Sequence, residues 1–232
     1  LPHSSEEPAQ TQPPELTRAA ETQPVKLDLA SGQSPRDGFE GVDIAAGPGV
    51  AHVVNLWRFP WPWADNSVDE LHCSHHAEHI PMEYVGMEHY DKRTTVEKQS
   101  GGSVVDFDPK NYPHLDKDLL FAFFDECYRI LKPDGVMTVI VPAATSTRAF
   151  QDPTHRRYIV AETFCYLSDE WRKSQRLDHY KVDCNFAGNT NFTMFVQEGA
   201  RSAEAQQHRF QHYWNTILDL HCVMKAIKPS RT

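Results

Sequence analysis

The sequence predicts an α/β fold with a mostly parallel sheet flanked by helices. Short apolar runs bounded by Gly, Pro, Asn or Asp fill the first half, a strong amphipathic helix follows at 116–132, and an apolar, β-branched run at 136–144 comes directly after it. A helix that leads into a fully apolar strand is typical of a crossover between parallel strands. The 232 residues are 40% hydrophobic, which is enough for one core, so we expect a single domain at 25–232.

The elements of the first half follow from local patterns. The helix at 116–132 begins with acidic residues, repeats Leu119, Phe123 and Ile130 at helical spacing, and ends before Pro133 and Gly135. The strands expected before it are 25–30, 39–44, 51–56 and 68–74.

The second half predicts two more helices and the remaining strands. The helices are expected at 161–174 and 202–214, and the strands at 179–186, 190–197 and 217–228. We expect a mostly parallel sheet whose late strands form an antiparallel edge.

Two segments fall outside this pattern. Residues 1–24 contain five prolines and almost no large apolar residue, which predicts a disordered tail. Residues 81–115 form an insertion where a few residues would suffice, and a lid, a binding loop and a disordered segment all remain open for it.

Composition limits the partners and the compartment. A net charge of -9 disfavours nucleic acid as a partner, although the run at 172–176 leaves open a local cationic patch beside the favoured interpretation of a solvated helix face. The five cysteines form no CxxC pair, so we expect reduced thiols and a cytoplasmic protein. No apolar run approaches the roughly 20 residues needed to cross a bilayer, so no membrane partner is expected.

The most informative stretch is 26–44, where one apolar run ends in a small-residue turn at Gly32 and the next ends in Asp43. The pattern predicts a nucleoside site in which bare backbone meets a charged group and a carboxylate meets a ribose diol. A nicotinamide enzyme is the weaker interpretation, because a pyrophosphate requires the further glycines that this turn lacks.

Longer blocks point to one family. The order LDLASG, GVDI, FPWPWADNSVDEL, HHAEHIP and YRILKPDG resembles class I S-adenosylmethionine-dependent methyltransferases over residues 25–145. The later QDPTHRRYI and VMKAIKP resemble a type 11-like branch of bacteria and their phages. The resemblance implies a Rossmann-like methyltransferase fold, with a mostly parallel seven-stranded sheet and an antiparallel edge strand. It also implies S-adenosyl-L-methionine as cofactor.

The resemblance also implies where the cofactor binds. Asp43 would accept hydrogen bonds from both ribose hydroxyls, and the Asn55 carbonyl oxygen would pair with the adenine amino group. The cofactor-binding residues implied in this way are Ala30, Ser31, Gly32, Asp43, Asn55, Leu56 and His75.

The chain departs from the family in two connections. About six residues separate Gly32 from Phe39, and 45–49 is equally short, whereas the family has a helix in each place. This departure motivates a second hypothesis, a catalytically inactive methyltransferase-fold module for binding or assembly.

Three residues are candidates for catalysis: His76, Asp152 and His155. A histidine with a near-neutral pKa beside the pocket could remove a proton from the acceptor, and Asp152 could orient His155 as a base while Arg156 and Arg157 hold an anion. The alternative for this segment is a proline turn capped by Asp152.

Other polar and aromatic clusters are ambiguous. His75 and His79 stand four residues apart and could share a metal, but no third ligand is evident, so no metal site is predicted. Trp57, Trp61 and Trp63 fit either a substrate platform or a packed edge.

The expected activity is transfer of a methyl group to an oxygen or nitrogen of a small molecule or protein. The chain lacks the DPPY, NPPY and Pro-Cys motifs that hold a flipped base, which disfavours DNA as the acceptor. The sequence does not predict the oligomeric state.

Overall fold

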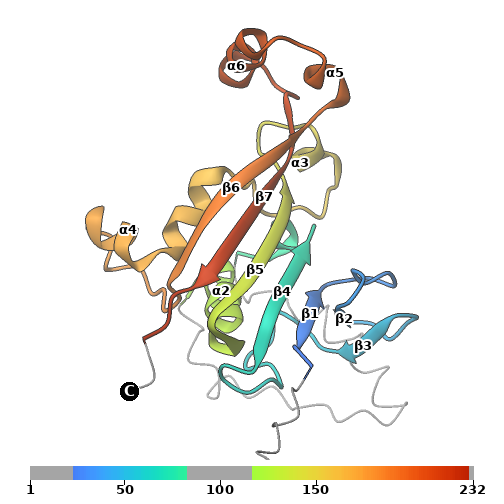
Figure 1. Cartoon of the computed structure of the whole chain (residues 1–232), viewed down its shortest axis with the longest axis vertical. Coiled ribbons are helices and arrows are strands. Elements are labelled where there is room, and N and C mark those ends of the chain that lie inside the picture. Colours follow the sequence, from blue (N-terminus) through green and yellow to red (C-terminus); the bar gives the residue numbers. More distant parts are fainter. Residues whose placement is uncertain (1–22, 83–116, 230–232) are drawn as a thin grey trace, which may run out of the picture.

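The computed structural model describes residues 23–82 and 117–229. It contains a seven-stranded sheet in the order β3-β2-β1-β4-β5-β7-β6 (Figure 1). Strands β1 to β5 pair in parallel, and β7 lies antiparallel between β5 and the edge strand β6. This is the Rossmann-like methyltransferase fold expected from the sequence, with antiparallel pairing confined to one edge.

The bounds of the elements are as follows. The strands are β1 Lys26–Leu29, β2 Glu40–Asp43, β3 Val50–Val53, β4 Val68–Ser74, β5 Leu131–Pro142, β6 Phe186–Met194 and β7 Ile217–Ala226. The α-helices are α2 Leu119–Ile130, α3 Arg148–Gln151, α4 Asp169–Ser174, α5 Val196–Gly199 and α6 Ala203–His212, and the 3-10 helices are η1 Ala77–His79 and η4 Ala161–Leu167.

Most of the predicted elements are confirmed, and the differences have local causes. The helix expected at 161–174 is divided at Ser168, whose hydroxyl caps α4 by accepting from the Trp171 N–H at 3.3 Å. The prediction of separate strands at 179–186 and 190–197 was wrong, because one strand, β6, covers 186–194. The preceding Asp183 and Cys184 donate their N–H groups to the Asp125 carboxylate of α2 instead of to a strand.

The predicted tail and insertion lie almost wholly outside the described residues, so both stay predictions. None of the helices in the described part of the chain is long and apolar enough to span a bilayer.

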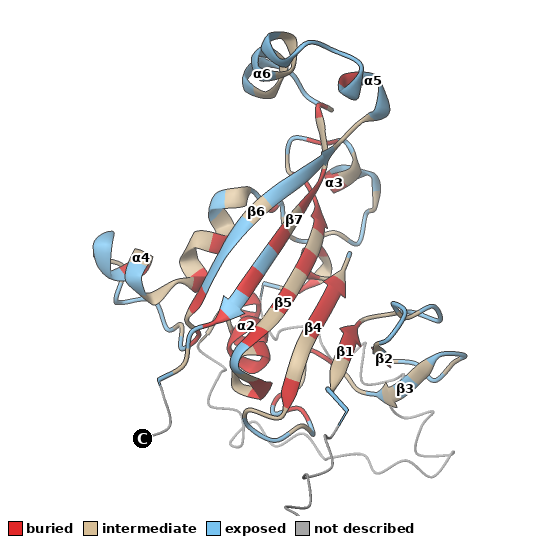
Figure 2. Ribbon diagram, viewed as in Figure 1, coloured by how far each residue is buried: buried red, intermediate tan, exposed pale blue. Residues whose placement is uncertain are grey.

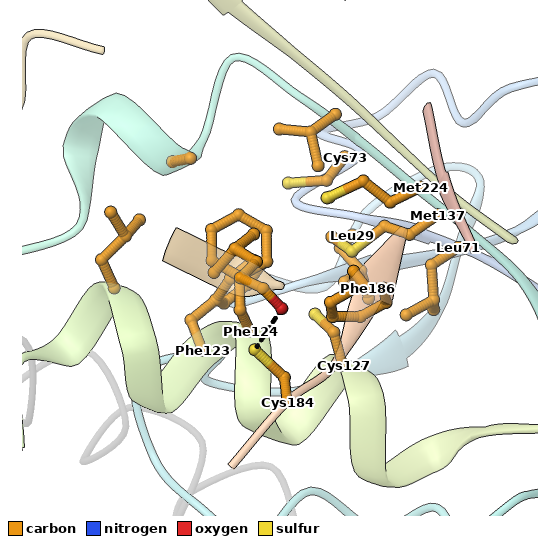
Figure 3. Packing of buried hydrophobic residues seen from close by; sticks show 14 of the residues in the cluster. Leu29, Leu71, Cys73, Phe123, Phe124, Cys127, Met137, Cys184, Phe186 and Met224 are labelled. Atoms are coloured by element: carbon orange, nitrogen blue, oxygen red, sulfur yellow. Dashed lines mark hydrogen bonds between the residues drawn. The ribbon is translucent and has the colours of Figure 1, made fainter. Parts of the chain in front are cut away.

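One face of the sheet is covered by α2. Figure 1 shows α2 behind the sheet, and Figure 3 shows Phe123, Phe124 and Cys127 of α2 beside buried side chains of the strands. Leu71 of β4 and Met137 of β5 are register partners that belong to this same core. Burial of this apolar face is the main favourable term in folding.

The opposite face is far less covered. Buried and half-buried or exposed residues alternate along β5 and β7 (Figure 2), and no described helix crosses this face in Figure 1. On β7, Met224 is 3% exposed while its neighbour Val223 is 43% exposed. A parallel sheet with helices on both faces would bury both, so the described part of this domain has its core on one side.

Short loops stand where helices would cover the second face. A Cβ on Gly41 of β2 would lie 2.4 Å from the Gly49 carbonyl oxygen and 3.2 Å from Pro35, so the connections after β1 and β2 converge there. Phe39 lies edge-on to His72 of β4 with ring centroids 6.0 Å apart. The two connections predicted to be short are indeed loops.

Two buried carboxylates of α2 hold distant segments in place. Asp125 accepts from the backbone of 183–184 and pairs with Lys117. Glu126 accepts from the Trp61 N–H at 2.6 Å and pairs with Arg129. The helix therefore fixes both the segment after β3 and the segment before β6.

The cationic run at 172–176 is not a fully solvated helix face. The Arg172 side chain is buried and donates to the carbonyl oxygens of Tyr166, Val182 and Cys184, and Lys173 pairs with Asp169 at 2.7 Å. Arg172 is therefore structural.

A pair of β7 substitutions tests the one-sided core. We expect Met224→Ala to lower the free energy of unfolding by about 2–5 kcal/mol, because it leaves a cavity in the core. The adjacent Val223→Ala should cost less than about 1 kcal/mol. Urea denaturation of both variants measures the difference, and equal losses would show that the second face is covered as well.

Thiol reactivity gives a second test. Burial raises the pKa of Cys73, Cys127 and Cys184 well above the usual value and that of Cys222 to about 11, while Cys165 is only half-buried. Because the thiolate is the reactive form, one thiol should react quickly with a disulfide reagent in the folded protein at pH 8. Cys165→Ser should remove that fast phase, and an unchanged fast phase would contradict the assignment.

Candidate functional site

A pocket of about 340 Å³ opens at the carboxyl ends of β1, β2 and β3. This edge is where open α/β sheets bind ligands. The residues that line it are Ala30, Asp43, Ile44, Val54, Asn55, Leu56, Trp57, His76, His79 and Thr154. Its volume falls in the range of small-molecule sites.

The turn after β1 is tied to the end of β2 by Asp43. One carboxylate oxygen accepts from the Gly32 N–H at 2.9 Å and the other from the Ala45 N–H at 3.2 Å. Ala30 and Gly32 adopt positive φ angles of 56° and 59°, which allow this tight turn. An ionised carboxylate accepts about four hydrogen bonds, so Asp43 retains capacity for two hydroxyl donors.

Asn55 is oriented by its own turn. Its Oδ1 atom accepts from the Trp57 N–H at 3.0 Å, and its buried Nδ2 atom has no hydrogen-bond partner among residues 23–82 and 117–229. The Oδ1 atom keeps a second lone pair, so the expected contact between the Asn55 carbonyl oxygen and the adenine amino group stays a prediction.

His76 lies between aromatic rings at the inner side of the pocket. Its ring is stacked with Trp57 at a centroid distance of 6.1 Å and lies 5.6 Å from Phe123. Burial, aided by His79, lowers the pKa of His76 to about 4. The near-neutral pKa expected of a pocket histidine does not apply to His76, which is uncharged at neutral pH and a weak base.

The segment 152–157 folds against η1. The N–H groups of Arg156 and Arg157 donate to the Glu78 carbonyl oxygen at 2.8 and 3.0 Å. Arg157 also binds the Ile80 and Pro81 carbonyl oxygens and forms an ion pair with Asp118. The Arg157 guanidinium therefore fastens the segment 152–157 to the residues that follow η1. The expectation that Arg157 holds an anionic ligand was wrong.

The expected Asp152–His155 pair is not formed. Asp152 Oδ1 accepts from both the N–H and the hydroxyl of Thr154, at 2.8 and 2.7 Å, which lowers the pKa of Asp152. His155 Nδ1 instead donates to the Ala149 carbonyl oxygen at 2.9 Å. Asp152 therefore orients Thr154, which in turn contacts His79 Nδ1 at 3.0 Å.

A cluster that the sequence analysis missed adjoins the pocket through His79. Glu78, His79 and His155 each offer a ligand atom, and these atoms lie within 4.8 Å of one another. The rings of His79 and His155 meet edge-on with centroids 4.6 Å apart. The histidine expected to join His79 was His75, but the Nδ1 atom of His75 pairs with Glu78 at 3.2 Å from an exposed position.

The structure brings part of the predicted site together. Of the implied cofactor residues, Ala30, Asp43, Asn55 and Leu56 line the pocket, whereas Ser31, Gly32 and His75 do not. Of the catalytic candidates, His76 lines the pocket, while Asp152 and His155 contact it only through Thr154 and His79. Their catalytic roles stay predictions.

The three tryptophans were expected to form either a substrate platform or a packed edge, and the structure shows both kinds of position. Trp61 is buried against Phe123 at 5.6 Å and belongs to the core, and Trp63 packs edge-on to it. Trp57 alone of the three lines the pocket.

Comparisons with known proteins give similarity in structure alone. No family model and no curated protein matches the chain. Similar solved structures include a SAM-dependent methyltransferase from Archaeoglobus fulgidus, with 15% identity, 87% of this chain and 86% of that chain covered, and a TM-score of 0.49. Another, from Methanosarcina mazei, has 12% identity, 88% and 92% coverage and a TM-score of 0.44.

A putative methyltransferase from Listeria monocytogenes is similar at 12% identity, with 89% and 92% coverage and a TM-score of 0.42. These values are too low to carry an argument about activity. The fold assignment therefore rests on the strand order and the antiparallel β7 of this chain itself.

Proposed function

We propose that this protein binds S-adenosyl-L-methionine and transfers its methyl group to an oxygen or nitrogen atom of a small molecule or protein. The observation that carries the proposal is the pocket beyond β1 to β3, which gathers Ala30, Asp43, Asn55 and Leu56. A resemblance in the sequence alone implied those same four residues as cofactor contacts. The finer assignment to a type 11-like bacterial or phage branch, and a cytoplasmic location, also belong to the proposal.

The residues present fit the cofactor. Asp43 has unused acceptor capacity for the ribose hydroxyls, and the Asn55 carbonyl oxygen has a second lone pair for the adenine amino group. Ala30 adds no side chain beyond Cβ, which leaves room for the methionine portion. The pocket offers donors, acceptors and an apolar wall without a lysine or arginine among its lining residues, as suits a positively charged ligand.

Catalysis would rest mainly on alignment. Ala30, Asp43, Asn55 and Leu56 would hold the cofactor, which would supply an electrophilic methyl group on a sulfonium to an acceptor atom aligned with its carbon–sulfur bond. His76, uncharged because its pKa is about 4, contributes shape and a hydrogen-bonding nitrogen more than basicity.

Calorimetric titration of the full chain with S-adenosylmethionine tests the cofactor site. Asp43→Asn should weaken binding about 10-fold to 100-fold, because a hydrogen bond to a charged group contributes about 1.5–3 kcal/mol. Asp37→Asn, the same change at an exposed position of the preceding loop, is the matched control and should bind like the parent. Absence of binding at millimolar cofactor would refute the proposal.

The alternative function is a methyltransferase-fold module that binds without catalysis. The loops that stand in place of helices after β1 and β2 favour it, because they shorten the wall of the cofactor site. Mass spectrometry of ligands that co-purify with the full chain separates the two. A methylated acceptor found together with the demethylated cofactor supports the enzyme. A retained ligand found with neither of these products supports the binding module.

A further inference from the structure

We propose that Glu78, His79 and His155 form a binding site for one divalent transition-metal ion. Glu78 and His79 come from η1, and His155 comes from the loop that the Glu78 backbone carbonyl anchors. A chelating triad of two imidazoles and one carboxylate is thus built by contacts that span more than 70 residues of sequence. The proposal concerns these residues alone and does not require a cofactor to bind.

The Glu78 carboxylate is buried and incompletely paired. Glu78 is 2% exposed, and its Oε2 atom has no hydrogen-bond partner within the described ranges. Its ion-pair contacts are the rings of His75 at 3.2 Å and His155 at 4.0 Å. Because a buried charge is costly unless it is paired or coordinates a metal, a cation between these groups would offset the burial of Glu78.

Hydrogen bonds at Nδ1 fix the orientation of the His79 and His155 rings. His155 Nδ1 faces the Ala149 carbonyl oxygen, which can only accept, so Nδ1 carries the proton. The Thr154 hydroxyl gives its proton to Asp152 and therefore accepts from His79 Nδ1. Both rings thus keep a lone pair on Nε2, and hydrogen bonds of this kind commonly fix metal-binding histidines.

The ligand atoms of Glu78, His79 and His155 have nearly the spacing that a bound metal ion requires. Ligand atoms about 2.1 Å from a metal lie about 3.0–3.4 Å apart at tetrahedral or octahedral angles. His155 Nε2 and Glu78 Oε1 are 4.0 Å apart, and the whole set falls within 4.8 Å. Side-chain shifts on the order of 1 Å would therefore close the triad around an ion.

The donor set indicates the kind of ion. Imidazole nitrogens suit Zn²⁺, Fe²⁺, Co²⁺ and Ni²⁺, whereas Mg²⁺ and Ca²⁺ prefer oxygen ligands. Three protein ligands leave a coordination position open. His79 also lines the pocket, so that position would lie next to it.

The place of the ion beside the pocket limits the chemical class of the methyl acceptor. This inference rests on the proposed function. An ion at this place would bind an acceptor through oxygen and favour loss of the hydroxyl proton, as bound metals do for water. The class of acceptor that fits is an oxygen nucleophile able to ligate a metal, such as a vicinal diol or a hydroxy acid.

Calorimetric titration of the chelator-treated full chain with ZnCl₂ tests the site. We expect one site in the parent, and Glu78→Gln should weaken it at least about 100-fold, because even partners outside the ligand shell change metal affinity about 10-fold to 100-fold. The same protein loaded with CoCl₂ should show visible absorption bands that Glu78→Gln removes. Zinc binding by Glu78→Gln that equals the parent would overturn the proposal.

The control addresses adventitious zinc. His208 and His212 face each other on α6 with ring centroids 4.6 Å apart, a spacing that can also bind zinc. The double variant His208→Gln/His212→Gln should keep the site, and its loss there would assign zinc to α6 and overturn the inference. Should Glu78→Gln fail to fold by circular dichroism, His79→Gln, at a half-buried position, takes its place with the same expected loss.

The metal result and the cofactor result are separable. Zinc binding by the parent together with no S-adenosylmethionine binding would leave the metal site standing and refute the methyltransferase. Cofactor binding that Asp43→Asn weakens, in a protein that binds no zinc, would support the methyltransferase and refute the metal site.

Discussion

The packing of α2 on one face of the sheet is the constraint on which the rest of the structure depends. Its aromatic stripe buries the inner face of β4 and β5, and its two buried carboxylates fasten segments that are distant in the sequence. Glu126 holds the chain that leaves the pocket after β3, and Asp125 holds the chain that enters β6. Removing either carboxylate would leave buried N–H groups without a partner, which costs more than the bond itself contributes. The helix thus sets the positions of both edges of the sheet.

Short loops, and not helices, form the wall of the pocket beside β1 and β2. Where the family expectation is a helix after β1, the chain has a turn held by Asp43, and the loops packed over Gly41 leave little freedom around it. The same carboxylate that would meet a ribose already organises the backbone on both sides of itself. Binding would therefore require little reordering, and preorganisation of this kind offsets part of the affinity that a shorter wall loses.

Local patterns predicted much of the fold, and contacts between distant segments account for what they missed. The apolar runs of β1, β2 and β4 and the spacing of α2 are readable because each depends on a few neighbouring residues. Asp43 and Asn55 were predictable as strand-end residues, but the direction of the Asn55 amide depends on the Trp57 N–H. The absence of a strand at 179–185 depends on Asp125, and the meeting of Glu78 with His155 depends on backbone bonds that no spacing encodes.

The long hairpin of β6 and β7 has its own consequence. The two strands run beyond the rest of the sheet and carry α5 and α6 at their tip (Figure 1). Met194 and Ile217 are register partners, so the chain leaves and returns about one strand spacing apart. Inside the tip, Glu198 is paired with Arg201 and Arg209, which gives the segment its own polar centre. Changes of length or sequence in this segment should therefore cost little stability, because loop-closure entropy rises only slowly with loop length and no residue of 195–216 belongs to the hydrophobic core.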